Sequence, residues 1–208
     1  MMKRCIVIGS MPVEIDLNRI INDDDFVFCA DGGYLQAQKQ GVVPHVIVGD
    51  FDSSPQPQDT TAVIEKLPVE KDDTDTYHIA RQIVCDGFTH AVFCGVTGGR
   101  LDHTIANIQM LKFLELNGVD AVIVDKTTTI NVIANRNITL KPHNDRYFSI
   151  FSLDNECTGV SEKGGKYRIS DVKITNDFPI GVSNEFKGEA VEISVKNGTL
   201  LIITTKKD

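Results

Sequence analysis

Apolar and polar positions alternate along the chain in two different ways. In the first part, five short runs rich in Val, Ile, Phe and Cys are apolar at successive positions, at residues 5–9, 26–30, 46–49, 91–96 and 121–124. Such runs are typical of strands buried on both faces of a parallel sheet. Helical stretches are predicted between them at 33–40, 74–85 and 101–117, each closed by a glycine. This alternation predicts an open α/β sheet. In the third helix, the apolar stripe is expected on Leu101, Ile105, Ile108 and Leu111.

The pattern changes near residues 127–136, and no helical periodicity follows residue 137. Runs at 138–140, 147–153, 168–174, 190–195 and 199–204 read as strands separated by polar turns. The pair Asn197-Gly198 favours a type I′ turn and predicts a hairpin between the last two strands. We therefore expect an α/β domain with an open, mostly parallel sheet and flanking helices at 1–130. An all-β, sandwich-like domain is expected at 131–208.

Composition narrows the class of protein. The chain has 208 residues, 41% of them hydrophobic, and a formal net charge of −8, which is unlike a nucleic-acid-binding surface. Five scattered cysteines without a C-x-x-C pair predict a reduced, cytoplasmic protein. The first apolar run is too short for a signal peptide, and no run is long enough to span a bilayer. Neither a membrane nor a nucleic acid is expected as a partner.

The most informative candidate site is the carboxylate pair Asp50 and Asp52, which directly follows the apolar run 46–49. If the chain stays extended there, side chains two residues apart point the same way. Two carboxylates at a strand end can share a hard cation such as Mg²⁺, which usually carries phosphates with it. The alternative is a solvated turn, because Asp and Ser are common turn residues.

Three further strand ends carry acidic or glycine-rich clusters, at residues 31–33, 70–75 and 97–102. In an open α/β sheet these ends meet at one edge, where ligands bind. Clustered acids repel one another unless a cation joins them, so a divalent metal with a polyphosphate is predicted. For single motifs the alternatives are a plain turn at Asp31 and a helix cap at Asp72 or Thr74. Asp75 shares a helix face with Ile79 and Ile83, which aims it toward the protein body.

A phosphate-binding loop is predicted where Gly98, Gly99 and Arg100 precede a helix. Helix N-terminal amides bind anions, and a guanidinium suits phosphate oxygens. Asp102 either caps this helix or meets the metal or substrate, and Lys71 either steadies a phosphate or is simply exposed. The five histidines form no ligand-spaced pair, so zinc is not expected, and His103 is interpreted as a surface or core residue.

Taken in order, these motifs resemble the thiamine pyrophosphokinase family over nearly the whole chain. The resemblance rests on segments 31–33, 44–53, 71–75 and 98–103, and on a fifth segment in the β domain, 181–185. It implies a homodimer with its sites at the subunit interface. It also implies transfer of the pyrophosphoryl group of ATP to the hydroxyl of thiamine, giving thiamine diphosphate and AMP.

The resemblance also implies residue roles. Mg²⁺ is expected on Asp50, Asp52 and Asp75, with Arg100 and Asp102 completing the catalytic set. ATP contacts are expected from Asp31, Lys71, Asp72, Gly98, Gly99 and Arg100. Thiamine contacts are expected from Ser183 and Asn184, whose side chains match the donors and acceptors of an aminopyrimidine. The chain contains no Trp, which leaves Phe186, Tyr167 or Phe178 as candidates for stacking on thiamine.

Two other functions compete with this interpretation. A strand ending in Asp-x-Asp also resembles the nucleophile motif of haloacid-dehalogenase-type phosphatases, although that motif usually follows the first strand. A non-enzymatic nucleotide or thiamine sensor is the second alternative. Retention of all the acids together with Arg100 argues against a sensor, since a pure binder has little use for so many metal ligands.

Overall fold

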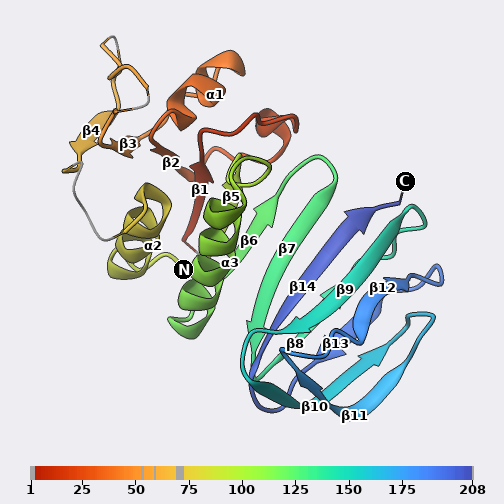
Figure 1. The fold of residues 1–208 in the computed structure, drawn as a ribbon. Coiled ribbons are helices and arrows are strands. Elements are labelled where there is room, and N and C mark those ends of the chain that lie inside the picture. Colours follow the sequence, from red (N-terminus) through yellow and green to blue (C-terminus); the bar gives the residue numbers. More distant parts are fainter. Residues whose placement is uncertain (1–2, 53, 59, 69–72, 208) are drawn as a thin grey trace. The chain divides into compact units, whose positions relative to one another are not determined.

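The computed structural model describes residues 3–52, 54–58, 60–68 and 73–207, and it divides the chain into two compact units (Figure 1). The α/β unit covers Met1–Lys126 and the β unit covers Thr127–Asp208. The predicted fold class is confirmed: a parallel sheet flanked by helices is followed by an antiparallel, sandwich-like unit.

The sheet of the α/β unit has the strand order β6-β5-β1-β2-β3-β4, and every pair within it is parallel. Its strands are β1 (Arg4–Ile8), β2 (Phe26–Ala30), β3 (Val46–Gly49), β4 (Val63–Lys66), β5 (His90–Cys94) and β6 (Asp120–Val124). The order reverses between β1 and β5, which makes the crevice at their carboxyl ends the expected place for a ligand.

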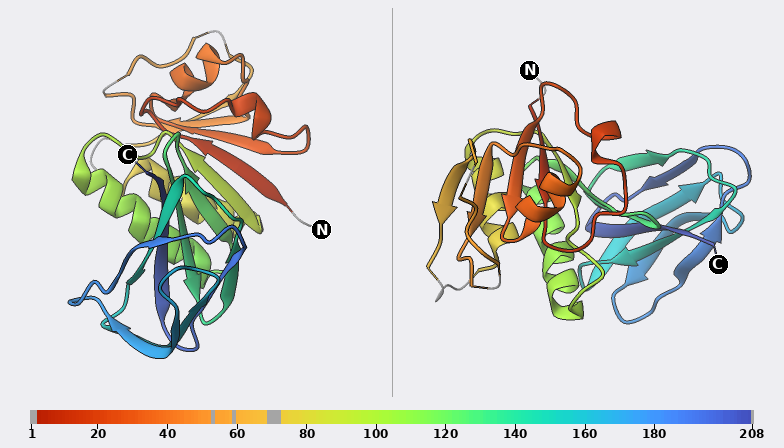
Figure 2. Two further views of the ribbon diagram at one scale, coloured as in Figure 1. Left: turned by 90° about the vertical axis from the view of Figure 1, so that its right-hand side faces the viewer. Right: turned by 90° about the horizontal axis from the view of Figure 1, so that it is seen from above.

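The helices α1 (Gly33–Lys39), α2 (Asp75–Cys85) and α3 (Leu101–Leu116) and the 3-10 turn η1 (Leu17–Arg19) connect these strands. α1 lies on one face of the sheet, and α2 and α3 lie on the other (Figure 2). The three predicted helices are confirmed to within one residue at each end. The glycine after each of them has a positive φ, as expected for a helix stop.

Two expectations for the α/β unit are wrong in detail. A strand was expected to run up to the acidic segment 70–75, but the strand before this segment, β4, ends at Lys66. In α3, Leu101 is 73% exposed and Ile105 50% exposed, whereas the buried side chains are Asn107, Met110, Leu111 and Leu114. Because this helix is apolar on several faces, periodicity alone did not identify which face is buried.

The β unit consists of two antiparallel sheets. One has the order β12-β9-β14-β7 and the other β11-β10-β13-β8. The strands are β7 (Thr128–Ala134), β8 (Asn137–Leu140), β9 (Arg146–Ser152), β10 (Glu156–Lys163), β11 (Ile169–Thr175), β12 (Gly181–Glu185), β13 (Val191–Ser194) and β14 (Thr199–Lys206). Inward-facing residues of both sheets, including Phe148, Val160 and Ile202, form one apolar cluster between them.

The predicted hairpin at Asn197-Gly198 is wrong. β13 and β14 lie in different sheets, so the turn carries the chain across the sandwich. A type I′ turn needs positive φ at both central residues, but only Gly198 has it, at 110°. The Asn135 side chain accepts a 2.9 Å hydrogen bond from the Gly198 N–H, and Asp154 accepts one of 2.7 Å from the Thr199 N–H. Strands β7, β10 and β12 were not predicted.

The cysteines pack as expected for small hydrophobic residues. Cys5, Cys29, Cys94 and Cys157 are buried and only Cys85 is exposed, and all five are free thiols. Among the helices of the described residues, none has the length and apolar character needed to cross a bilayer.

Candidate active site

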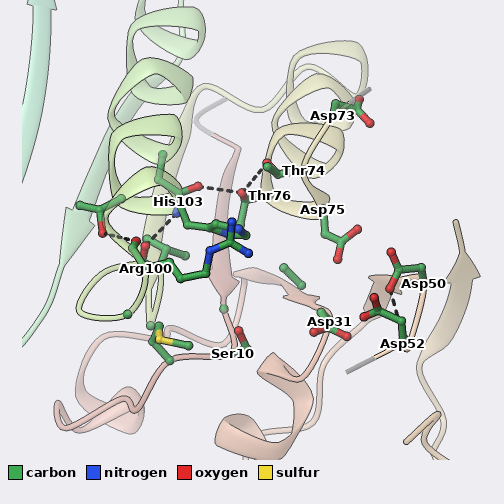
Figure 3. A pocket seen from close by; sticks show the side chains of 18 residues that line it. Ser10, Asp31, Asp50, Asp52, Asp73, Thr74, Asp75, Thr76, Arg100 and His103 are labelled. Carbon is green, nitrogen blue, oxygen red and sulfur yellow. Dashed lines mark hydrogen bonds between the residues drawn. The ribbon is translucent and has the colours of Figure 1, made fainter. Parts of the chain in front are cut away.

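A pocket of about 530 Å³ lies at the carboxyl edge of the parallel sheet (Figure 3). It is lined by the ends of β1, β2, β3 and β5 and by the first turns of α2 and α3. The lining residues are Gly9, Ser10, Met11, Ala30, Asp31, Asp50, Asp52, Asp73, Thr74, Asp75, Thr76, Gly95, Val96, Gly99, Arg100, His103, Thr104 and Asn107. The pocket therefore occupies the crevice where the strand order reverses.

Glycines allow the turns at this edge to approach closely. A Cβ on Gly9 would collide with the carbonyl oxygen of Gly95, which lies at the end of the neighbouring strand β5. A Cβ on Gly33 would collide with the carbonyl of Ile8. Residues with a side chain would not fit at these two positions, so the glycines let the turns pack directly against the neighbouring strand ends.

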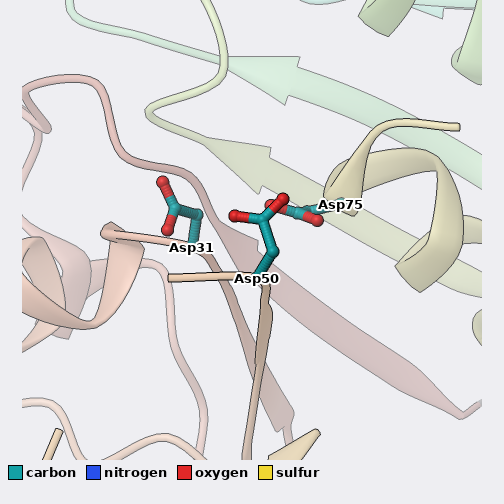
Figure 4. Close-up of side chains that lie close together, drawn as sticks. All are labelled: Asp31, Asp50 and Asp75. Atoms are coloured by element: carbon teal, nitrogen blue, oxygen red, sulfur yellow. The ribbon is translucent and has the colours of Figure 1, made fainter. Parts of the chain in front are cut away.

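Asp31, Asp50 and Asp75 form one wall of the pocket (Figure 4). Each offers a carboxylate oxygen, and these three oxygens all lie within 4.8 Å of one another. The three side chains are half-buried and come from the ends of β2 and β3 and the start of α2. Carboxylate oxygens at this spacing are the donors that a hard divalent cation prefers.

Asp52 lies beside this cluster and is not one of its three members. Its backbone N–H donates to Asp50 Oδ1 at 3.2 Å, so it orients the Asp50 carboxylate. The intervening Phe51 has φ +58° and turns the chain out of the extended conformation on which the expectation for Asp52 depended. Asp31 also has positive φ, +46°, and accepts a 2.9 Å hydrogen bond from the Ser54 hydroxyl. Positive φ at Asp31, a member of the cluster, and at Phe51, directly after Asp50, is backbone strain of the kind that gathers at functional sites.

The opposite wall carries the glycine-arginine loop before α3. Arg100 and His103 lie across the pocket from Asp31, Asp50 and Asp52 (Figure 3).

Asp102 lies in the first turn of α3, is bonded to the loop residue Arg100 and does not line the pocket. The Arg100 guanidinium donates to both Asp102 oxygens, with an Nε–Oδ1 distance of 3.1 Å and an Nη2–Oδ2 distance of 2.6 Å. The hydrogen bond from Arg100 lowers the pKa of the Asp102 carboxyl, and the same bond raises the pKa of Arg100. Gly98 has φ +89°, a conformation that L side chains rarely adopt.

The first turn of α2 brings Asp75 to the pocket. Thr74 is the N-cap, as its alternative interpretation predicted, and its hydroxyl oxygen accepts from the Tyr77 N–H at 3.2 Å. Ile79 and Ile83 are fully buried below Asp75, which confirms the predicted direction of this helix face. Two predicted ligands of the same segment, Lys71 and Asp72, lie outside the described residues.

In the β unit, Ser183 and Asn184 have different environments. Ser183 is exposed, has φ +57° and lies in an irregularity of the β12–β9 pairing. Asn184 is 8% exposed, and its amide makes four hydrogen bonds within the protein. Its oxygen accepts from the N–H groups of Tyr167 and Glu185, and its nitrogen donates to Glu162 and to the Tyr167 carbonyl.

These four bonds use both donors and both acceptor positions of the amide. Asn184 therefore supports the surrounding strands, and the direct thiamine contact that the resemblance implied stays a prediction. Its partner Glu162 is 1% exposed and also accepts from the Gly165 N–H at 2.6 Å. Burial raises the pKa of the Glu162 carboxyl, against the lowering effect of these hydrogen bonds.

Sequence reasoning missed Ser10, Thr76 and Asn107, all of which line the pocket. Ser10 follows β1, so the argument that places residues after parallel strands at the ligand-binding edge could have identified it. Asn107 lies seven residues after Arg100, two turns along the same face of α3. The only sign of Asn107 in the sequence was that a polar residue stands at this position of an apolar helix.

Known proteins match this chain over almost its full length. The family model described as "Thiamin pyrophosphokinase, catalytic domain" matches residues 17–123, more than half of the chain, and that described as "Thiamin pyrophosphokinase, vitamin B1 binding domain" matches 135–200. A thiamine pyrophosphokinase of Bacillus subtilis (strain 168) is 25% identical over 212 residues, covering 97% of this chain and 98% of the relative.

Solved structures agree on the fold. A Bacillus subtilis thiamine pyrophosphokinase superposes with a TM-score of 0.89 at 22% identity, covering 98% of this chain and 99% of that one. A Geobacillus thermodenitrificans thiamin pyrophosphokinase gives a TM-score of 0.87 at 23% identity, covering 99% and 98%. Together with the family models, these matches define the chain as an enzyme of the diphosphotransferase class. Within that class it belongs to the thiamin pyrophosphokinase family. These matches do not favour the two alternative functions, a haloacid-dehalogenase-type phosphatase and a non-enzymatic sensor.

Proposed function

We propose that the chain transfers the pyrophosphoryl group of ATP to the hydroxyl of thiamine. The thiamine oxygen forms a bond to the β-phosphorus, the bond from that phosphorus to the α-phosphate oxygen breaks, and AMP leaves. The hydroxyl proton is released in the same exchange. The observation that carries the proposal is the wall of three carboxylates facing Arg100 across the pocket at the strand-order reversal.

The donor chemistry of the acidic wall fits Mg²⁺. Three half-buried carboxylates within 4.8 Å offer only hard oxygen ligands, and no sulfur or imidazole belongs to the cluster. We assign the metal to Asp50 and Asp75, with Asp31 as the third ligand and Asp52 orienting Asp50. When bound, Mg²⁺ neutralises phosphate charge and orients the polyphosphate for in-line transfer.

Arg100 and the glycine loop supply the second contact to the polyphosphate. The guanidinium is held as a planar fork by Asp102, so little side-chain freedom is lost when it contacts a phosphate oxygen. Gly98 and Gly99 expose backbone N–H groups before α3, where anions bind. Phosphoryl transfer depends mainly on positioning and charge stabilisation, which these groups provide. Lys71 and Asp72 remain predicted ATP contacts.

For thiamine we propose a direct contact to Ser183, with Asn184 holding the Tyr167 backbone beside it. Ser183 is exposed on a strained, irregular stretch of β12, and Phe178 and Val182 are exposed nearby in the sequence. Tyr167 is exposed too, and its backbone is bonded to Asn184, the neighbour of Ser183. Aromatic and apolar surface suits the rings of thiamine, and Tyr167 and Phe178 are candidates for stacking. Phe186 is 8% exposed and packs on Phe148, which favours a structural role for it.

We also propose a homodimer with the site at the subunit interface, and a reducing, cytoplasmic setting. Five free thiols, four of them buried, support the setting. The dimer is supported by the exposed apolar residues Leu101, Ile105 and Leu116 of α3. Sedimentation equilibrium tests it, and a monomer at micromolar concentration would overturn it.

The activity is tested by incubating the protein with ATP, Mg²⁺ and thiamine and separating the products by chromatography. Thiamine diphosphate and AMP are expected in equal amounts, and neither is expected when thiamine is left out. Asp50→Asn, with the same shape and one charge fewer, is the matched variant and should lose turnover. Thiamine-dependent release of ADP, or no turnover by the unmodified protein, would overturn the proposal.

A further inference from the structure

Four polar groups that line the pocket form a hydrogen-bonded chain. The hydroxyls of Thr74 and Thr76 are 3.0 Å apart (Figure 3), and Thr76 Oγ1 donates to Asn107 Oδ1 at 2.7 Å. Asn107 Nδ2 then donates to the backbone carbonyl of Val96 at 2.8 Å. The chain therefore links the start of α2, through α3, to the segment that follows β5.

The direction of every bond in this chain is fixed by chemistry. The Val96 carbonyl can only accept, so the Asn107 amide nitrogen faces it and the amide oxygen faces Thr76. Thr76 uses its single hydrogen on that oxygen, so the Thr74 hydroxyl must donate to Thr76. Thr74 in turn accepts from the Tyr77 N–H at 3.2 Å. Exchanging the donor and acceptor roles of any one group would break two hydrogen bonds, so only this arrangement satisfies all of them.

The chain connects the two walls of the site. Asp75 lies between the two threonines in sequence, and Val96 leads into the loop that contains Gly99 and Arg100. Asn107 is 5% exposed, and the other fully enclosed positions of α3 are apolar. A buried amide in such a helix is unfavourable unless it is bonded, so its two bonds hold both segments in place.

We propose that Asn107 is a positioning residue that fixes Asp75 relative to the glycine-arginine loop before substrate enters. A ligand that contacts both walls at once needs the correct distance between Asp75 and the glycine-arginine loop. Small misplacements of reacting groups lower rates steeply. The inference rests on the proposed function for its kinetic consequence only. Its structural consequence, coupling of the α2 start to residues 96–100, is independent of what the pocket binds.

The test removes one hydroxyl without changing shape. Thr76→Val deletes the donor to Asn107, Thr76→Ser restores it, and Thr89→Val is the matched control at the opposite end of β5. We expect Thr76→Val to raise the KM for Mg·ATP about tenfold, the effect of about one lost hydrogen bond, with the KM for thiamine unchanged. The serine variant and the control should stay within about twofold of the unmodified protein.

Amide hydrogen exchange without ligand is the second readout. Thr76→Val should accelerate exchange at residues 75–78 and at 96–100 together, while Thr89→Val leaves both segments unchanged. If Thr76→Val does not fold, Asn107→Asp replaces it at pH 8: this variant keeps the acceptor for Thr76 and removes the donor to Val96. It should accelerate exchange at 96–100.

The outcomes separate the two proposals. Unchanged exchange at 96–100 in the folded variants, or equal rises in both KM values, would overturn the positioning role even if thiamine diphosphate is formed. Coupled acceleration in a protein that forms no thiamine diphosphate would support the positioning role and overturn the proposed reaction.

Discussion

Replacing Asp50 by Asn should stabilise the protein without metal and destabilise it, relative to the unmodified chain, with metal. The carboxylates of Asp31, Asp50 and Asp75 approach within 4.8 Å. At that distance two unit charges repel by about 1 kcal/mol at the dielectric constant of water and about 3.5 kcal/mol at an effective value of 20. Asn keeps the oxygen that accepts from the Asp52 N–H and removes two of the three repulsive pairs.

Because the three side chains are half-buried and screened by salt, the relief should be about 1–2 kcal/mol. For a chain of this size, each kcal/mol moves a thermal midpoint by roughly 2–4 °C, so a rise of roughly 2–8 °C is expected in EDTA. Adding Mg²⁺ and ATP at about 100 times their dissociation constant should stabilise the unmodified protein by about 2.7 kcal/mol. The variant should gain little, so the order of the two midpoints reverses.

The assay is thermal unfolding followed by circular dichroism, in EDTA and in excess Mg·ATP without thiamine. Asp86→Asn, at the far end of α2, is the control for removing a negative charge elsewhere, and its midpoint should shift equally in both conditions. Asp52→Asn tests whether the third metal ligand is Asp31 or Asp52. If Asp52 is the ligand, this variant should behave like Asp50→Asn. A lower midpoint for Asp50→Asn in EDTA, or an equal Mg·ATP shift in both proteins, would refute the reasoning.

Three further predictions concern other parts of the chain. Arg100→Lys should raise the KM for ATP about tenfold in steady-state assays, because an ammonium cannot make the planar two-point contact; an unchanged KM contradicts the phosphate role. Burial raises the pKa of Glu162, so folding favours the protonated carboxyl. The resulting stabilisation is full below the pKa of this group in the unfolded chain and is lost as the pH rises through its pKa in the folded protein. Urea titrations at a series of pH values should show that Glu162→Gln abolishes this loss above the ordinary range of a glutamate carboxyl, and an unchanged dependence of stability on pH would contradict the prediction. Ellman's reagent should label one thiol, Cys85, in the native protein, since burial raises the pKa of Cys5, Cys29 and Cys94 to about 12; rapid labelling of a second thiol would contradict this.

Patterns along the chain predicted the elements of the α/β unit well and the β unit less well. Runs such as 46–49 are apolar at every position because both faces of the parallel sheet are covered, and this signal is strong in a short window. Strands β7, β10 and β12 each have a partly exposed face and carry Gly, Ser or Asn, so their local signal is weak. The hairpin error at Asn197-Gly198 has a related cause, because a turn residue does not specify which strand its neighbours pair with.

The strand-end rule also predicted much of the site, with one consequential exception. Asp50, Asp75 and Arg100 line the pocket as expected. Asp31 was expected as an ATP contact and Asp52 as a metal ligand, but the structure groups Asp31 with Asp50 and Asp75. The two-residue period holds only while the chain is extended, and the positive φ of Phe51 ends it after a single step. Nothing in the local sequence required that conformation of a phenylalanine.

Residues that hold the site differ from residues that face a ligand in how the sequence encodes them. Asp31 and Asp50 directly follow strands, so the position of the strand was enough to find them. Asn107 and Asn184 are defined by partners 31 and 22 residues away, Thr76 and Glu162, and each uses the donor and acceptor of one amide to join two segments. Periodicity averages over side chains and carries no information on such directional pairs. Substitutions at these amides should therefore alter the site without removing any group that contacts a substrate, and variants chosen from motifs alone would miss them.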